Sequence, residues 1–225
     1  MSSSDYRRIA RENLQGNWGQ SILVAFVAAL LGGLITGSAF FSLNIDAEIL
    51  QELPMAVQRY VALTASIASF LSLVRFIIGG PLQLGYSQYL LNQYNRANFD
   101  IKDLFSQFDQ FGRGFLQNFL RGLYIALWSL LFVIPGIVKQ FSYAMTPFIM
   151  AENPDMTANE AITASRELMD GHKGELFILD LTFIGWDLLA LLTLNFGHIF
   201  LNPYRNAAHA AFYKDLTAPG ATVEP

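Results

Sequence analysis

Residues 10–23 read ARENLQGNWGQSIL, and residues 165–178 read SRELMDGHKGELFI. Both contain the pattern Arg-Glu-x-x-x-Gly-x-x-Gly, and both stand directly before a long apolar run. The matched residues are Arg11, Gly16 and Gly19 in the first copy and Arg166, Gly171 and Gly174 in the second. Glycine suits the left-handed position after a helix end. We therefore interpret the pattern as an elbow, where a helix on the membrane surface ends and the chain turns into the bilayer, with Trp18 as an interfacial anchor.

The composition predicts that lipid is the solvent. The chain has 225 residues, of which 53% are hydrophobic and 14% are charged, against about 25% charged residues in typical soluble domains. A net charge of −4 without a basic block argues against nucleic acid as a partner. The absence of cysteine excludes disulfides and thiolate chemistry.

Apolar and amphipathic stretches alternate along the chain. The apolar stretches lie near residues 20–41, 60–93, 115–134, 136–151, 175–194 and 197–215. Several approach the roughly 20 residues that a membrane span needs, whereas 60–93 is too long for one simple span and 136–151 is short. The amphipathic stretches cover residues 4–15, 100–114 and 153–171. In the third, Thr157 and Glu160 have the spacing of a capping box.

This alternation predicts an all-α fold, a polytopic membrane helix bundle of about six spans with three interfacial amphipathic helices on the cytoplasmic side. We expect one domain, residues 1–225, built from repeat units 4–96, 99–152 and 155–216, followed by a short disordered tail at 217–225. Helix breaks are expected at Gly79, Gly80, Pro81, Pro135, Gly136 and Pro203. Most lysine and arginine residues then fall on one side, which predicts a multi-pass protein of the cytoplasmic membrane with both termini in the cytoplasm.

Four charges interrupt the apolar runs: Arg75, Lys139, Asp180 and Asp187. A charge inside a bilayer normally has a partner or a water path. Asp180 and Asp187 are seven residues apart and share a helix face, and we expect Asp187 to pair with Lys139 or Arg75. Three roles stay open for these charges: an ion pair that holds helices together, transport or proton relay, and snorkelling to the interface.

Small residues recur at four-residue intervals in the first apolar run, at Ala25, Ala29, Gly33 and Gly37. This spacing lets helix backbones approach closely. It predicts packing against another helix of the same chain or, as the alternative, the seam of a homodimer.

Four further stretches resemble a known family. They are GPLQLG (80–85), LWSLLFVIPGIVKQFSYAM (127–145), ELMDGHKGELFILDLTFIGWDLL (167–189) and NPYRNAAHAAFYKDL (202–216). They are similar to an uncharacterised family of bacterial, mostly Gram-positive, integral membrane proteins (domain of unknown function 975). A more distant likeness is to the membrane domain of glycerophosphodiester phosphodiesterases, whose catalytic domain is absent here. The resemblance implies several membrane helices and no established activity.

No motif for catalysis, a cofactor or a metal is present, and the three histidines lack ligand spacing. We expect a non-enzymatic membrane module that contacts lipids or hydrophobic peptides, or that acts as a scaffold or regulator. Membrane lipids are the expected partners, with a homo-oligomer or a membrane-protein partner as further options. The alternatives are a small secondary transporter that uses the buried charges and, less favoured, an intramembrane enzyme. A polar cavity at Asp187 would favour transport, whereas a groove that faces lipid would favour the module.

Overall fold

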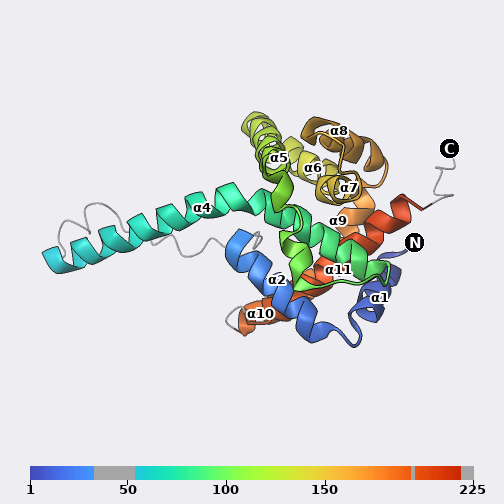
Figure 1. The fold of residues 1–225 in the computed structure, drawn as a ribbon, viewed down its shortest axis with the longest axis horizontal. Coiled ribbons are helices and arrows are strands. Elements are labelled where there is room, and N and C mark those ends of the chain that lie inside the picture. The colour runs from blue at the N-terminus through green and yellow to red at the C-terminus, as the bar shows by residue number, and fades with distance from the viewer. Residues whose placement is uncertain (33–53, 194–195, 219–225) are drawn as a thin grey trace.

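The computed structural model describes residues 1–32, 54–193 and 196–218 (Figure 1). All regular elements within these ranges are helical, which confirms the all-α class. The α-helices are α1 (Ser3–Leu14), α2 (Trp18–Gly32), α4 (Met55–Tyr94), α5 (Phe111–Leu131), α6 (Val133–Ser142), α7 (Thr146–Glu152), α8 (Ala158–Leu168), α9 (Lys173–Leu181), α10 (Ile184–Leu192) and α11 (His198–Leu216). Two 3-10 turns, η1 (Ile101–Phe105) and η2 (Phe108–Gln110), connect α4 to α5.

The long helix α4 dominates the shape of the protein. Its N-terminal part projects away from the other helices, and no residue from 55 to 78 is buried (Figure 1). Within α4 an 18-residue stretch has a mean hydropathy of 2.0, so this helix is long and apolar enough to cross a membrane. The pair α1 and α2, bent by 103°, passes the same test only if it is counted as one broken span. Helix length and composition thus support one or two spans, and six spans are not established.

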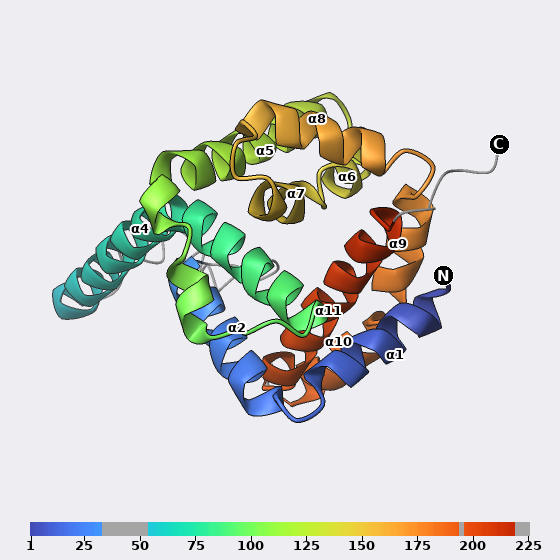
Figure 2. The same ribbon diagram turned by 45° about the vertical axis from the view of Figure 1, so that its right-hand side comes forward.

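The three predicted units pack in a cyclic order. The first apolar helix of each unit lies on the preceding unit: α5 packs on α4, α9 on α6, and α2 on α11. The surface elements follow the same rule, because η1 packs on α4 and α2, α8 on α5 and α6, and α1 on α11 and α9. Figure 2 shows the resulting ring, with the C-terminal half of α4, α7 and α11 toward its middle. The repeat itself stays a prediction, because packing order does not test whether the units share an origin.

The core lies where these inner helices meet. Leu84 and Tyr89 of α4, Met150 of α7 and Phe212 of α11 are all less than 2% exposed. Tyr6 of α1 closes the core, with its ring edge-on to Phe212 at a centroid distance of 5.2 Å. The surface helix α1 is therefore fixed by its own apolar face.

The glycines expected to break α4 instead allow close helix contact. The helix continues through Gly79, Gly80 and Pro81, and all three are buried. A Cβ atom on Gly79 would lie 2.8 Å from the carbonyl oxygen of Gly32 in α2, and one on Gly80 would lie 2.1 Å from that of Gly114 in α5. The predicted break takes the form of a bend within a continuous helix, because α4 changes direction near its contact with α5 (Figure 1). The bend is consistent with Pro81, which removes one helical hydrogen bond.

The other two expected breaks are also displaced. The chain reverses at Phe132, whose backbone is extended, so Pro135 falls in the first turn of α6, where proline is tolerated. Gly136 packs against Ser129 of α5, since a Cβ there would lie 2.1 Å from the serine hydroxyl. Pro203 is buried within the continuous helix α11. It is the sixth residue of that helix, so it removes the hydrogen bond to the carbonyl of Ile199 without ending the helix.

The predicted helices differ from the observed ones in three further places. The stretch 100–114 begins as the turns η1 and η2, because Asp100 caps Ile101 and Ser106 bonds back to the carbonyl of Asp103. The stretch 136–151 is divided between α6 and α7, and 175–194 is divided between α9 and α10. Gly33, Gly37 and the tail 219–225 lie outside the described residues.

Candidate functional site

The two elbows share one backbone conformation. Gly16 follows α1 with φ of 82°, and Gly171 follows α8 with φ of 81°. A Cβ atom would meet nothing within 4 Å at either position, so the left-handed conformation, not lack of space, favours glycine. Gly19 and Gly174 lie one residue into the next helices, α2 and α9. The turn is therefore made at the first glycine of each pair.

The start of α8 is fixed by the predicted capping box. The Thr157 backbone N–H and hydroxyl both donate to the Glu160 carboxylate at 2.8 Å, and the Glu160 N–H donates to the threonine oxygen at 3.4 Å. The backbone hydrogen bond, followed by the hydroxyl bond, lowers the pKa of Glu160 below its ordinary value. This surface helix is thus held at both ends by local sequence signals.

Asp187 has partners other than those predicted. Its carboxylate accepts a hydrogen bond from Nη2 of Arg205 at 2.5 Å and lies 3.4 Å from Nε2 of His198. Both partners belong to α11, the neighbouring helix of the same hairpin. Asp180, seven residues earlier, lies 2.7 Å from Nε2 of His209. The two aspartates lie on different helices, Asp180 on α9 and Asp187 on α10, and both bind α11.

The two cations expected to pair with Asp187 contact other residues. Arg75 donates from Nε to the carbonyl oxygen of Leu30 in α2 at 3.2 Å. Lys139 lies over the ring of Trp128, 4.6 Å from its centroid, in a cation–π contact. The predicted pairing of Asp187 with either cation is wrong, because Asp187 binds Arg205 and His198 instead.

The small-residue stripe of α2 faces other helices of the chain. Ala25 is buried together with Ser21, Val24 and Ala28, whereas Ala29 is only partly buried. Ser21 connects this face to α4, since its hydroxyl accepts from the Gln93 amide at 2.8 Å and lies 3.2 Å from the Tyr89 hydroxyl. The described part of the stripe therefore packs within one chain, and the homodimer alternative is untested.

The arginines of α1 divide into two kinds. Arg8 contacts Asp5 at 3.8 Å and Glu12 at 3.2 Å, so two carboxylates neutralise it. Arg7 and Arg11 form no side-chain hydrogen bond or ion pair with any residue that the structure describes, and Nε of Arg7 is buried without a partner. These two guanidinium groups are four residues apart, which places them on one side of the helix.

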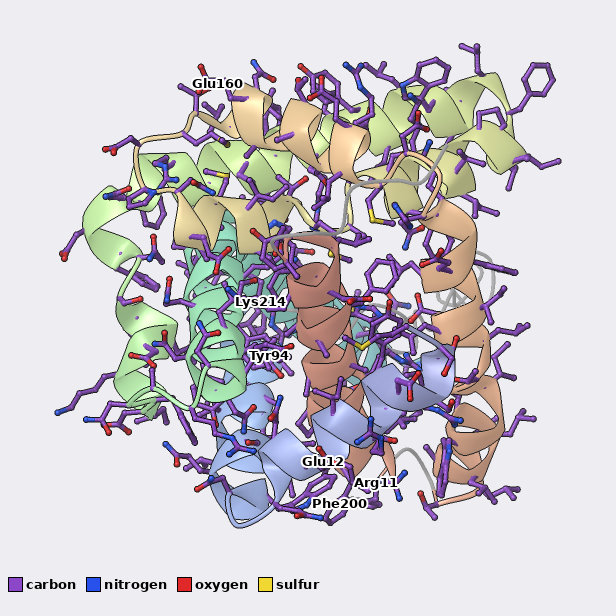
Figure 3. The ribbon with its side chains drawn as sticks, turned by 90° about the vertical axis from the view of Figure 1, so that its right-hand side faces the viewer. Arg11, Glu12, Tyr94, Glu160, Phe200 and Lys214 are labelled. Carbon is purple, nitrogen blue, oxygen red and sulfur yellow. The ribbon has the colours of Figure 1, made fainter. Side chains whose placement is uncertain are left out.

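Arg7 and Arg11 line an open pocket of about 510 Å³ between the elbow and the hairpin of α10 and α11. The other lining residues are Trp18, Trp186, Leu189, Ala190, Thr193, Gly197, Phe200, Leu201 and Tyr204. Figure 3 shows Arg11 and Phe200 at the same edge of the molecule. The pocket thus combines two unpaired cations with an apolar, aromatic wall, and Asp187 is not among its lining residues.

A second pocket of about 420 Å³ lies between α5, α6 and α8. Arg166, which aligns with Arg11 in the sequence pattern, lines it together with Tyr124, Trp128, Lys139, Tyr143, Asn159, Ile162 and Thr163. Its polar groups largely bind one another, because the Tyr124 hydroxyl donates to Asn159 at 3.0 Å and Lys139 covers Trp128. Both pockets form where a surface helix covers the preceding hairpin.

Comparison with known proteins identifies a family. The family model described as "Protein of unknown function (DUF975)" matches residues 1–142 and 130–219. The chain belongs to this family. No curated protein and no solved structure matches it. The comparisons thus confirm the uncharacterised family and give no support to a likeness with glycerophosphodiester phosphodiesterases.

The DUF975 chain shows no metal site in the ranges that the structure describes, where no three His, Asp or Glu side chains converge. Sequence reasoning singled out Arg11, Trp18 and Arg166 but missed Arg7, Trp186 and Tyr204. An available signal was the spacing of Arg7 and Arg11 on one side of a helix beside the better-balanced Arg8. No local signal showed that α10 and α11 of the DUF975 chain would face these arginines.

Proposed function

We propose that this protein is a non-enzymatic membrane module that anchors itself in the cytoplasmic membrane through α4 and binds lipids along its apolar surface. The observation that carries the proposal is the outer half of α4, residues 55–78. It is apolar, projects from the body and has no buried residue. At about 1.5 Å per residue it spans roughly 36 Å, which exceeds the roughly 30 Å of a bilayer core.

The distribution of side chains around α4 favours lipid over a partner protein. Leu63, Leu71, Leu73 and Phe76 are between 47% and 60% exposed, and at about 100° of rotation per residue they point to different sides of the helix. A docking helix presents one apolar stripe, whereas a helix that is apolar on all sides belongs inside a membrane or a large core. Each such side chain gains roughly 1.5–3 kcal/mol on leaving water. Water is therefore an unfavourable solvent for this segment.

The tips of two hairpins support contact with the same bilayer. Leu130 to Ile134, at the turn between α5 and α6, are between 66% and 82% exposed, and Leu192 at the end of α10 is 80% exposed. We assign these tips to the hydrocarbon region, which makes the protein multi-pass or multiply inserted. Both termini lie on one side in this arrangement. In support, the amino group of Met1 lies 3.3 Å from the carboxylate of Asp215.

Cysteine labelling tests the proposal cleanly because the chain contains no cysteine. Cells express one of three single variants: Ser2→Cys, Thr217→Cys or Leu63→Cys. Intact cells, and inverted membrane vesicles prepared from them, are treated with a membrane-impermeant maleimide. We expect Ser2→Cys and Thr217→Cys to react only in inverted vesicles, and Leu63→Cys to react in neither. Equal labelling of Leu63→Cys and Ser2→Cys would contradict insertion of α4. Labelling of the two termini from opposite sides would contradict the orientation.

A further inference from the structure

We propose that the pocket between α1, α10 and α11 binds one anionic phospholipid, with Arg7 and Arg11 holding the phosphodiester and the apolar wall holding the start of an acyl chain. This inference rests on the proposed function, because the ligand reaches the pocket from the bilayer.

The charge pattern of α1 shows that the pocket lacks a negatively charged partner for its arginines. Arg8, on the same helix, is matched by the carboxylates of Asp5 and Glu12. Arg7 and Arg11 have no such partner among the described residues, and no carboxylate lines their pocket. Like charges four residues apart on a helix repel each other. An anion bound between them removes this repulsion and gives the buried Nε of Arg7 an acceptor.

Arginine side chains also suit the chemistry of a phosphodiester. The guanidinium group is planar and donates paired hydrogen bonds to phosphate oxygens. The remaining polar groups of the pocket are a threonine hydroxyl, a tyrosine hydroxyl and two indole N–H groups, from Thr193, Tyr204, Trp18 and Trp186. These groups are neutral, so the site has net positive charge and no internal group that competes for the arginines.

The apolar wall distinguishes a lipid from a small soluble anion. Ala190 and Leu201 form the buried floor, at 4% and 6% exposure, while Trp186, Leu189 and Phe200 are between 54% and 60% exposed at the rim. The rim continues along α10 to Leu192, which lies three residues beyond Leu189 on the same side of the helix and is 80% exposed. An acyl chain that starts in the pocket therefore runs onto a surface that the proposed function places against lipid. Inorganic phosphate has no apolar part that could contact this wall.

Native mass spectrometry of the purified full chain in detergent tests the assignment. The protein is titrated separately with phosphatidylglycerol, phosphatidylcholine and inorganic phosphate, and the bound adducts are counted. We expect one saturable phosphatidylglycerol adduct, weaker binding of phosphatidylcholine and no phosphate adduct. The variant Arg7→Gln/Arg11→Gln should lose about tenfold or more in phosphatidylglycerol affinity, because it removes charge-assisted hydrogen bonds. The variant Arg7→Lys/Arg11→Lys keeps the charge without the paired donors and should bind at an intermediate level.

A matched control removes the same charge elsewhere. Lys139→Gln/Arg166→Gln takes two cations from the second pocket and should leave phosphatidylglycerol binding unchanged. An equal loss in this control would show that binding follows net charge alone, and tight binding of phosphate would show a site for free anions; either result overturns the proposal. Full binding by Arg7→Gln/Arg11→Gln with an unchanged circular dichroism spectrum also overturns it.

The test separates this inference from the proposed function. Alkaline carbonate extraction reports whether the wild-type chain is integrated in the membrane, independently of the pocket. An integrated protein without the phosphatidylglycerol adduct refutes the lipid site alone. A protein that carbonate extracts from the membrane refutes the proposed function.

Discussion

Residues 55–78 and residues 79–94 belong to one continuous helix, α4, and both are rich in apolar side chains. The outer segment has no buried residue, whereas most residues of the inner segment are buried against α2, α5, α7 and α11. The two segments differ in glycine: the inner one carries Gly79, Gly80 and Gly85, and the outer one has none. A Cβ on any of these three would lie within 2.8 Å of the backbone of a neighbouring element. Apolar side chains thus predict that a helix segment is removed from water. Glycine indicates where the backbone of another helix, and not lipid, covers that segment.

The largest effect is expected when charges enter the outer segment. Leu63→Asp/Phe70→Asp places two carboxylates in the proposed bilayer core, at a cost of about 5–7 kcal/mol for the pair. We expect the variant to leave the membrane pellet on alkaline carbonate extraction. The control Leu63→Ala/Phe70→Ala should stay in the pellet. Retention of the aspartate variant would mean that this segment is not surrounded by lipid.

Truncation of leucine should separate the two segments by stability. Leu84 is fully buried in the inner segment, so Leu84→Ala should lower the free energy of unfolding by about 2–5 kcal/mol through lost burial and a cavity. Leu71, in the outer segment, is 47% exposed. Leu71→Ala should therefore change the free energy of unfolding by less than about 0.5 kcal/mol. Denaturant titration in detergent, followed by circular dichroism, measures both. Equal losses would remove the distinction between the segments.

Adding one methyl group tests the close contact at the junction. In Gly80→Ala the new Cβ meets the carbonyl of Gly114 at 2.1 Å, and we expect overpacking to cost about 1–3 kcal/mol of unfolding free energy. Gly112→Ala is the matched control, because its Cβ meets nothing within 4 Å and alanine favours helix. Thermal unfolding of both variants decides the matter. A Gly80→Ala protein as stable as the control would show that α4 and α5 have room to separate.

The smallest effect concerns a single hydroxyl group in each segment. Tyr89 lies 3.2 Å from the Ser21 hydroxyl in the buried inner segment, so Tyr89→Phe should cost about 1 kcal/mol. Tyr60 is 68% exposed at the start of the outer segment, and Tyr60→Phe should leave the unfolding free energy unchanged. The same denaturant titration compares them. Destabilisation by Tyr60→Phe alone would reverse our assignment of the two segments.

Much of the local structure could be predicted because its causes are local. The helical class, the capping box of Thr157 and Glu160 and the left-handed turn after α1 each depend on residues within a few positions of one another. The sequence did not show whether α4 and α11 would continue through Pro81 and Pro203. Proline affects only a few backbone hydrogen bonds, and its neighbours in the folded protein determined that α4 and α11 continue through it.

The candidate site could be predicted only in part. The aligned arginines Arg11 and Arg166 and the anchor Trp18 came from the sequence pattern. The partners of Asp187 did not, because four-residue and seven-residue spacing places charges on a helix face without showing which helix lies opposite. The structure brings Arg205 and His198 to that face and keeps Arg75 at the end of α2.

The sequence by itself determined that this chain is helical, poor in charge and bent at two glycine elbows, because composition and backbone conformation are properties of short segments. Only the tertiary structure decided that the units pack in a ring and that Arg7 and Arg11 face α10 and α11. Such contacts join residues from opposite ends of the chain, and they depend on how whole helices fit together. The same packing leaves no residue of the outer half of α4 buried, and on that segment the proposed membrane role depends.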